Sequence, residues 1–284
     1  MKPSIWTTMI WPSSPVGALE VLASHGWQAF ELACEHISML AGMGPQAVAE
    51  YAAAIKRLGV EVPQCHATIT ADVAAADANR RAADLAQIHR DIDICAELGI
   101  RNIVIHPGGY YDQAPNRAAM EAVDRARLKS FADLAAHCER VGTRMAIENM
   151  NDNGIGLWGS RRFGAIVEEI LGLIEHIGSP ALGVCLDTSH ANIQGLNQPA
   201  AVRTCGDKLI ALHISDNDGS GDQHKTPGYG SVDFPGIVTA LREVGYTSNF
   251  NLEIPGETAR GYAAREVVEL RSKYALGMCE LLLK

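Results

Sequence analysis

The chain has 284 residues, of which 47% are hydrophobic, and its 24 basic and 33 acidic side chains give a net charge of −9. This length fits a single domain over residues 1–284, because α/β barrels routinely fill about 250 residues. No stretch approaches the roughly 18 unbroken apolar residues of a membrane helix. The acidic balance argues against nucleic acid and acidic membrane surfaces as partners.

Two further features bear on location. The N-terminus carries no sustained apolar run before a small-residue cleavage site, so it does not resemble a signal peptide. The seven cysteines are odd in number and never form a Cys-x-x-Cys pair, which argues against a disulfide framework and against a cysteine zinc site. We therefore expect a cytoplasmic protein with reduced, buried thiols.

Short runs rich in apolar and β-branched residues alternate along the chain with amphipathic stretches of helical length, the signature of βα units. The expected strands lie at Ser4–Met9, Gln28–Ala33, Glu61–His66, Asn102–His106, Arg144–Glu148, Leu182–Asp187, Leu209–Ile214 and Asn249–Ile254. Between them, periodic apolar faces such as that from Leu85 to Leu98 end before a glycine, here Gly99. Eight such units predict a (β/α)8 TIM barrel, with a doubly wound open sheet as the alternative.

Ionisable side chains stand where the expected strands end. Successive strands finish at or next to Glu31, His66, His106, Glu148, Asp187, His213 and Glu253. In a (β/α)8 barrel these strand ends and the loops after them form the functional face. Because burying an unpaired carboxylate is costly, we expect a ring of such groups to be neutralised by a cation or by one another.

The strands of the last half of the barrel supply a coherent ligand set. Glu148, Asp187, His213 and Glu253 bring three carboxylates and one imidazole. This mostly hard oxygen set suits a divalent metal, with Mn²⁺ or Mg²⁺ preferred and Zn²⁺ or Co²⁺ as alternatives. For Glu31 we expect a hydrogen-bonded supporting role instead.

At these residues the sequence resembles the xylose isomerase-like barrel superfamily, which includes sugar-phosphate isomerases and epimerases, inosose and hydroxypyruvate isomerases, and endonuclease IV. The matching segments, spread over nearly the whole chain, are GWQAFELA, IHPGG, IENM, LDTSHA, HISDNDG, DQHKTPGYGSVDF and GYTSNFNLEIPG. The resemblance implies that Glu148, Asp187, His213 and Glu253 form the shared metal quartet. It also implies that His190 orients the substrate.

The implied chemistry is proton transfer on a small polyoxygenated substrate. A metal chelated by the carbonyl and the adjacent hydroxyl of a ketose acidifies the neighbouring C–H and stabilises the enediolate. Glu148 and Glu253 would remove and return the proton, and His190 would polarise the oxygen. This predicts an isomerase or epimerase of a keto sugar, sugar phosphate or cyclitol, with His66, His106 and His224 as further substrate contacts.

Departures from the pattern leave the outcome of the reaction open. Ketose 3-epimerases carry a Glu and an Arg where this sequence has Gly154 and Gly219, which argues against a ketose 3-epimerase proper. A lyase or dehydratase of an oxidised sugar shares the enolisation step and remains an alternative. Retention of every candidate ligand argues against a catalytically silent binding barrel. Because such barrels often pair, a homo-oligomer is a further expectation.

A nuclease is the competing hypothesis. His66, His106, Asp222 and His224 stand where endonuclease IV carries additional zinc ligands, and with the quartet and His190 they would complete a set for three metals, which could stabilise a phosphodiester transition state. A DNA enzyme must, however, neutralise several phosphates, and this chain is acidic. The loop Ala67–Thr70 is also too small and uncharged to wedge into a duplex. We therefore favour a small sugar-like substrate over nucleic acid.

Overall fold

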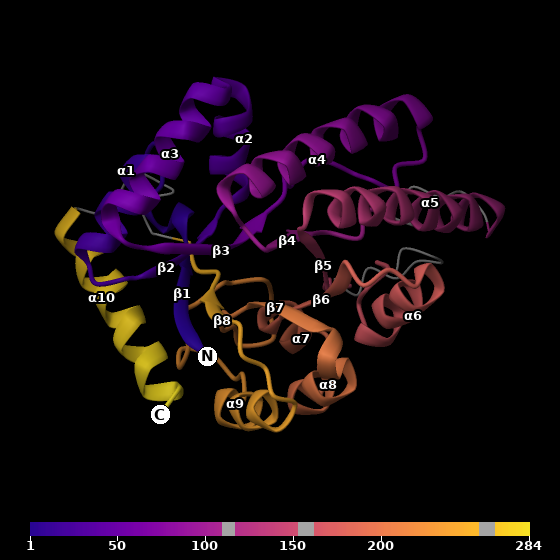
Figure 1. Cartoon of the computed structure of the whole chain (residues 1–284). Coiled ribbons are helices and arrows are strands. Elements are labelled where there is room, and N and C mark those ends of the chain that lie inside the picture. Colours follow the sequence, from indigo (N-terminus) through magenta and orange to yellow (C-terminus); the bar gives the residue numbers. More distant parts are fainter. Residues whose placement is uncertain (110–116, 153–161, 256–264) are drawn as a thin grey trace.

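A computed structural model describes residues 1–109, 117–152, 162–255 and 265–284. Eight parallel strands form one sheet, each strand lying beside the next in sequence (Figure 1). The strands are β1 (Lys2–Trp6), β2 (Ala29–Leu32), β3 (Glu61–His66), β4 (Asn102–Ile105), β5 (Arg144–Glu148), β6 (Leu182–Asp187), β7 (Leu209–His213) and β8 (Asn249–Leu252).

Helices follow the strands and form the outer layer of the molecule (Figure 1). They are α1 (Pro15–Ser24), α2 (Cys34–Met43), α3 (Pro45–Leu58), α4 (Ala78–Leu98), α5 (Arg117–Val141), α6 (Val167–Ile177), α7 (Thr188–Ile193), α8 (Gln198–Cys205), α9 (Phe234–Glu243) and α10 (Arg265–Leu282), with 3₁₀ turns η1 (Thr7–Ile10) and η3 (Gly206–Lys208). None of the described helices combines the length and the apolar character that crossing a bilayer requires.

The sheet closes on itself. β1 pairs with β8, and β7 meets β8 through a parallel bridge between Ile214 and Leu252. Two backbone hydrogen bonds complete this seam, from Ile214 N to Asn251 O at 2.8 Å and from Glu253 N to Ile214 O at 3.1 Å. The predicted TIM barrel is therefore confirmed, and the open doubly wound sheet is wrong.

The first strand is the element whose position differs most from the prediction. It covers Lys2–Trp6 and gives way to the turn η1, whereas Ser4–Met9 was expected. Thr7 explains the early end, because its Oγ1 accepts a hydrogen bond from Ala33 N at 3.0 Å and lies 2.8 Å from His36 Nδ1. These contacts bind the chain to the start of α2 instead of extending the strand.

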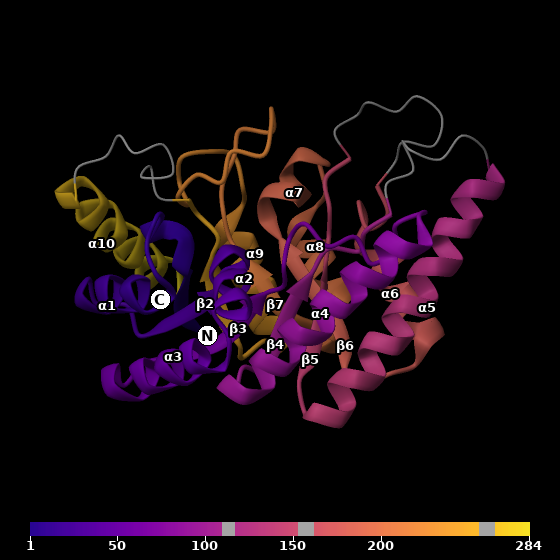
Figure 2. The same cartoon turned by 90° about the horizontal axis from the view of Figure 1, so that it is seen from above.

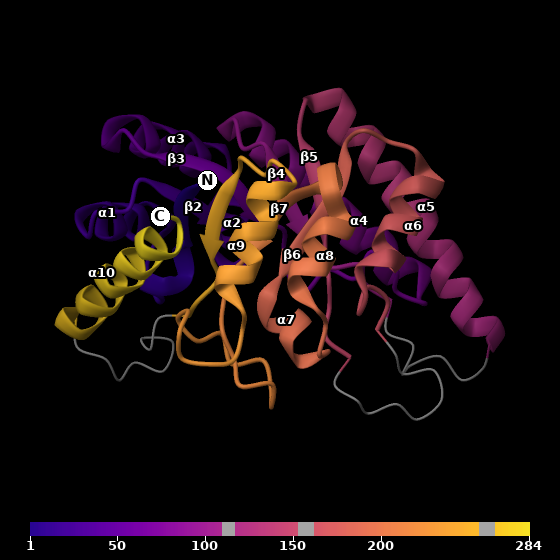
Figure 3. The ribbon, with the colours of Figure 1, turned by 90° about the horizontal axis from the view of Figure 1, so that it is seen from below.

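Helix ends and thiols agree with the predictions. α4 buries Ile88, Ile92 and Cys95 against the barrel and ends at Gly99, whose φ of 70° is the left-handed conformation that favours glycine. All seven cysteines are free and buried. At the closure of the barrel, Trp27 Nε1 donates to Ser272 Oγ of α10 at 3.0 Å, which ties the last helix beside α1 (Figure 3).

The functional face is the rim where the strands end. In Figure 2 the loop between β7 and α9 rises on the same side of the barrel as α7. α7 starts at Thr188, directly after the last residue of β6, so that rim is the carboxyl end of the strands. In the register of the sheet, Asp187 lies opposite His213, which brings two of the predicted ligands side by side.

Candidate active site

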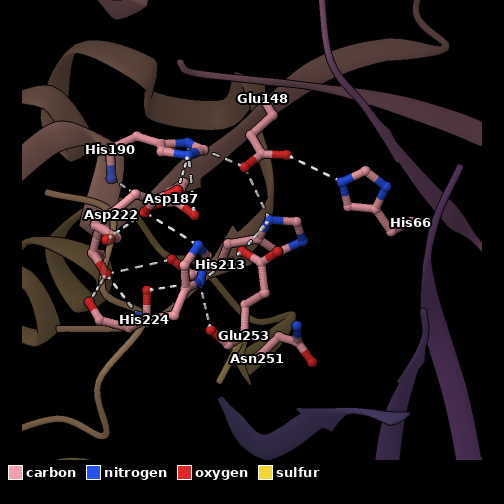
Figure 4. Close-up of polar contacts among 12 residues, drawn as sticks. His66, Glu148, Asp187, His190, His213, Asp222, His224, Asn251 and Glu253 are labelled. Carbon is pink, nitrogen blue, oxygen red and sulfur yellow. Dashed lines mark hydrogen bonds and ion pairs between the residues drawn. The ribbon is translucent and has the colours of Figure 1, made fainter. Parts of the chain in front are cut away.

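Four predicted ligands converge at the carboxyl ends of the last four strands (Figure 4). Glu148, Asp187 and His213 are the final residues of β5, β6 and β7, and Glu253 follows β8 directly. Each offers one ligand atom, and these four atoms all lie within 4.8 Å of one another. Their side chains are at most 7% exposed, so the group is largely shielded from solvent.

His213 sits at the centre of this quartet. Its Nδ1 lies 3.2 Å from Glu148 Oε1 and 3.1 Å from Glu253 Oε2. Its Nε2 lies 3.0 Å from Glu31 Oε1, and the Asn251 amide donates to the other Glu31 oxygen. Metal-ligating histidines commonly have a carboxylate on the second nitrogen. The contacts agree with the supporting role predicted for Glu31.

Several polar atoms of the quartet are buried without a hydrogen-bond partner in the described part of the chain. These atoms are Glu148 Oε2, Asp187 Oδ2, His213 Nδ1 and Glu253 Oε2. Orphaned buried polar atoms are rare, because each forfeits its hydration. A divalent cation within the quartet would satisfy Asp187 Oδ2, His213 Nδ1 and Glu253 Oε2 together. Glu148 faces this position through its other oxygen, Oε1, which lies 3.2 Å from His213 Nδ1. The quartet therefore fits the metal that the sequence predicts.

A second group uses the other oxygen of Glu148. His66 Nε2 lies 3.5 Å and His106 Nε2 3.4 Å from Glu148 Oε2. His66 Nε2 is also buried and without a hydrogen-bond partner among the described residues. Glu148 consequently lies between two candidate cation positions, as Figure 4 shows for its contacts with His66 and His213.

A third group lies on the other side of the quartet. His190 Nε2 is 3.3 Å from Asp222 Oδ2, and His224 Nε2 is 3.1 Å from Asp222 Oδ1. These three side chains also place one ligand atom each within 4.8 Å of the others. The nine side chains that the sequence singled out are thus brought together in three adjoining groups.

Backbone contacts fix the tautomer of three of these histidines. The Nδ1 atoms of His66, His190 and His224 lie 2.7, 2.8 and 2.9 Å from the carbonyl oxygens of Ala67, Asn149 and Glu253. A carbonyl only accepts, so each Nδ1 carries a proton and donates it. In the neutral ring the Nε2 lone pair then faces a carboxylate, which requires a proton or a cation between the two.

The family model of the xylose isomerase-like TIM barrel matches residues 19–274. The chain belongs to this family. A D-psicose 3-epimerase of Enterocloster bolteae is 30% identical over 162 residues, which are 54% of this chain and 49% of that protein. A probable endonuclease 4 of Thermoplasma acidophilum is 26% identical over 210 residues, 69% of this chain and 67% of that protein.

The barrel of this family member is also similar to solved structures. A D-psicose 3-epimerase crystallised in the presence of D-fructose superposes with a TM-score of 0.81 at 22% sequence identity. The superposition covers 100% of this chain and 99% of that one. At this identity the likeness bears on the xylose isomerase-like fold, and the chemistry has to be argued from the site itself.

The facing groups of this xylose isomerase-like barrel have shifted pKa values. Burial and the neighbouring Glu253 and Glu148 carboxylates raise the pKa of Asp187 to about 7, although the charge of His190 opposes this. Burial disfavours the charged form of His224, but Glu253 and Asp222 raise its pKa to about 10. Burial alone would raise the pKa of Glu253, yet the charge of His213 lowers it to about 2. Cations and protons therefore compete for the same positions.

Two supporting residues were not predicted from the sequence. Asn149 Oδ1 accepts from Asp187 N at 2.7 Å, and its own carbonyl holds His190, so one residue orients two members of the site. Asp216 accepts from Gly228 N at 2.9 Å and from Gly230 N at 2.8 Å, which folds the loop that carries His224. The signal is a polar residue close behind a predicted ligand: Asn149 directly follows Glu148 in IENM, and Asp216 follows His213 by three positions in HISDNDG.

The Trp6 ring centroid lies 5.9 Å from that of His66 and 6.4 Å from that of His213, so this indole borders the site. Gly219 lies in the β7–α9 loop with a φ of 82°. This position therefore lacks the arginine that ketose 3-epimerases carry. Gly154 lies outside the described residues.

Proposed function

We propose that this protein is a divalent-metal-dependent isomerase or epimerase of a keto sugar, sugar phosphate or cyclitol. The observation that carries the proposal is the pair Glu148 and Glu253, whose carboxylates both lie within 3.2 Å of His213 Nδ1. Each also keeps an oxygen without a hydrogen-bond partner among the described residues. Two carboxylates held at one cation position suit proton removal and proton return.

The quartet of Glu148, Asp187, His213 and Glu253 would hold the metal. The cation would supply electrostatic stabilisation of the negative charge that develops on the substrate oxygens. One glutamate would remove the proton on the carbon next to the carbonyl, and the other would return it. A return to the same carbon gives epimerisation, and a return to the neighbouring carbon gives isomerisation.

Histidines around the quartet would orient the substrate. His190 is fixed by Asn149 and would polarise the substrate oxygen through Nε2, which lies 3.3 Å from the partly exposed Asp222. His66, His106 and His224 would contact substrate hydroxyls. The D-psicose 3-epimerase relative supports a sugar-like substrate, whereas Gly219 argues against the reaction of a ketose 3-epimerase proper. A lyase or dehydratase would use the same first step.

A second candidate is a phosphodiesterase like endonuclease IV. The three adjoining groups with Glu148 shared between two of them favour it, because three close metals can stabilise both the attacking and the leaving oxygen. The endonuclease 4 relative supports the same reading. The net charge of −9 argues against a DNA substrate, and so do the small side chains of Ala67–Thr70. We therefore place this candidate second.

Two measurements test the proposal. Metal analysis of protein purified without chelator should give about one Mn²⁺, Mg²⁺ or similar ion per chain, and about three zinc ions would favour the phosphodiesterase. With a panel of ketoses and keto-inositols in D₂O, NMR should detect exchange of the substrate α-proton. Glu148→Gln and Glu253→Gln should slow this exchange at least about a hundredfold, as for lost general bases. Exchange at the wild-type rate in both variants would refute the assignment.

Three finer predictions go with the proposal. Mn²⁺ or Mg²⁺ is expected as the physiological ion, ahead of Zn²⁺ or Co²⁺. The cytoplasm is expected as the location. Association into a homo-oligomer is expected as well, and sedimentation velocity over a hundredfold range of protein concentration would detect it.

A further inference from the structure

His106 is held differently from the quartet. Glu148, Asp187 and His213 are strand residues, so the hydrogen bonds of the sheet fix their backbones. β4, in contrast, ends at Ile105, and His106 begins the turn His106-Pro107-Gly108-Gly109. Yet His106 Nε2 reaches Glu148 Oε2 at 3.4 Å. Something other than the sheet must hold this turn in place.

Arg127 of α5 binds the carbonyl side of the turn. Its side chain is only 1% exposed. Its Nε donates to Pro107 O at 3.2 Å, and its Nη2 donates to Gly108 O at 3.0 Å and to Gly109 O at 3.2 Å. The planar guanidinium also lies 4.1 Å from the ring centroid of Phe163, in the segment before α6. One buried arginine thus satisfies three consecutive carbonyls behind His106.

Asp72 binds the opposite side of the turn. Its Oδ1 accepts from Gly109 N at 2.8 Å and from Ala74 N at 3.0 Å. The fit is tight, because a Cβ added to Gly109 would lie 2.4 Å from Val123 Cγ1 and 2.7 Å from Arg127 Nη2. Gly108 and Gly109 both adopt positive φ, of 63° and 69°. Arg127 and Asp72 therefore hold this glycine turn from both sides.

We propose that Arg127 and Asp72 are positioning residues for His106. They act on the turn and through it set the distance between His106 and Glu148, the side chain shared by two of the three ligand groups. The inference rests on the proposed function, because Glu148 matters as a metal ligand and proton acceptor. A fork of guanidinium donors is needed for this role, since a lysine ammonium cannot satisfy three carbonyls in one plane.

Cobalt binding tests the proposal without a known substrate. Co²⁺ is titrated into metal-free protein and followed by its visible absorption, for wild type, Arg127→Lys, His106→Ala and the double variant. Loss of a support behind a ligand typically weakens metal affinity about 10-fold. We expect that loss for each single variant and no further loss in the double variant, because Arg127 acts through His106. Arg125→Lys, at an exposed arginine of the same helix, should bind as wild type does.

Two results would overturn the proposal. One is wild-type Co²⁺ affinity in Arg127→Lys. The other is a double variant in which the two losses multiply, which would assign Arg127 a structural role independent of His106. Asp72→Ala removes the contacts on the other side of the turn. It should also weaken Co²⁺ binding about 10-fold. In the His106→Ala background it should cause no further loss.

The failure of this inference is distinguishable from that of the proposed function. A wild-type protein that binds no Co²⁺ would refute the metal-dependent enzyme. In that case a crystal structure of the Arg127→Lys variant tests whether Arg127 positions His106. A His106 ring displaced from Glu148 supports the positioning role, and an unmoved ring contradicts it.

Discussion

Glu31 Oε1 lies 3.0 Å from His213 Nε2, although 182 positions separate the two residues in the chain. The contact joins β2 to β7 across the interior of the barrel and leaves Nδ1 of the imidazole directed at Glu148 and Glu253. Both side chains are fully buried. A carboxylate behind a ligating histidine fixes the ring and raises its basicity.

Glu31→Gln should therefore weaken divalent metal binding without removing a ligand. We expect a loss of about 10-fold to 100-fold in affinity, measured by calorimetric titration of Mn²⁺ into metal-free protein. Glu97→Gln, at an exposed glutamate of α4, serves as the control and should leave the affinity unchanged. Unchanged affinity in Glu31→Gln would mean that this pair does not support the metal site.

Gly230 should tolerate no side chain. A Cβ there would lie 2.1 Å from Asn217 O and 2.3 Å from Asp216 Oδ1, inside the turn that carries His224. Gly230→Ala should lower the free energy of unfolding by about 1–3 kcal/mol, the range for overpacked sites. Gly221→Ala in the same loop meets nothing within 4 Å and is the matched control. Urea denaturation of both variants measures the difference, and equal stabilities would contradict the packing described.

The metal-free protein should lose stability as the pH rises above neutrality. The folded-state pKa of His224 is raised from 6.5 to about 10 by Glu253 and Asp222 against the effect of burial. A raised histidine pKa stabilises the fold fully below pH 6.5, and this contribution disappears as the pH rises through 10. Asp187, with a pKa raised from 3.8 to about 7 mainly by burial, lowers the stability at lower pH, between 3.8 and about 7, so the loss above neutrality comes from His224.

Chemical denaturation in chelator at pH 6.5, 8 and 9.5 checks this trend. We expect a falling free energy of unfolding, and a flatter dependence in His224→Gln. Saturating Mn²⁺ should reduce the slope, because the cation replaces the bridging protons. A metal-free protein that becomes more stable between pH 6.5 and 9.5 would contradict the charge arrangement described.

Sequence periodicity was sufficient to predict the barrel, and the ionisable strand ends predicted most of the side chains that the fold brings together. β3, β5 and β6 begin and end at the predicted residues, and each of them ends in a buried ionisable side chain, His66, Glu148 or Asp187. The end of β1 could not be predicted, since it depends on Thr7 contacts with Ala33 and His36 that only the folded chain creates.

The supports of the site were harder to predict than its ligands. Ligands share one position, the strand end, which is visible in the sequence. Arg127 lies within an ordinary helical stretch, and only the fold brings its guanidinium onto three carbonyls of the β4–α5 turn. Asp216 likewise acts on backbone groups 12 to 16 residues further along. Such contacts depend on tertiary geometry and leave no periodic trace.

Anomalous diffraction from a crystal soaked in Mn²⁺ tests the central claim most directly. We predict a peak within about 2.0–2.3 Å of one atom each from Glu148, Asp187, His213 and Glu253, the usual range for oxygen and nitrogen ligands of divalent metals. A Mn²⁺ bound elsewhere, with these four side chains still paired only with one another, would contradict the account.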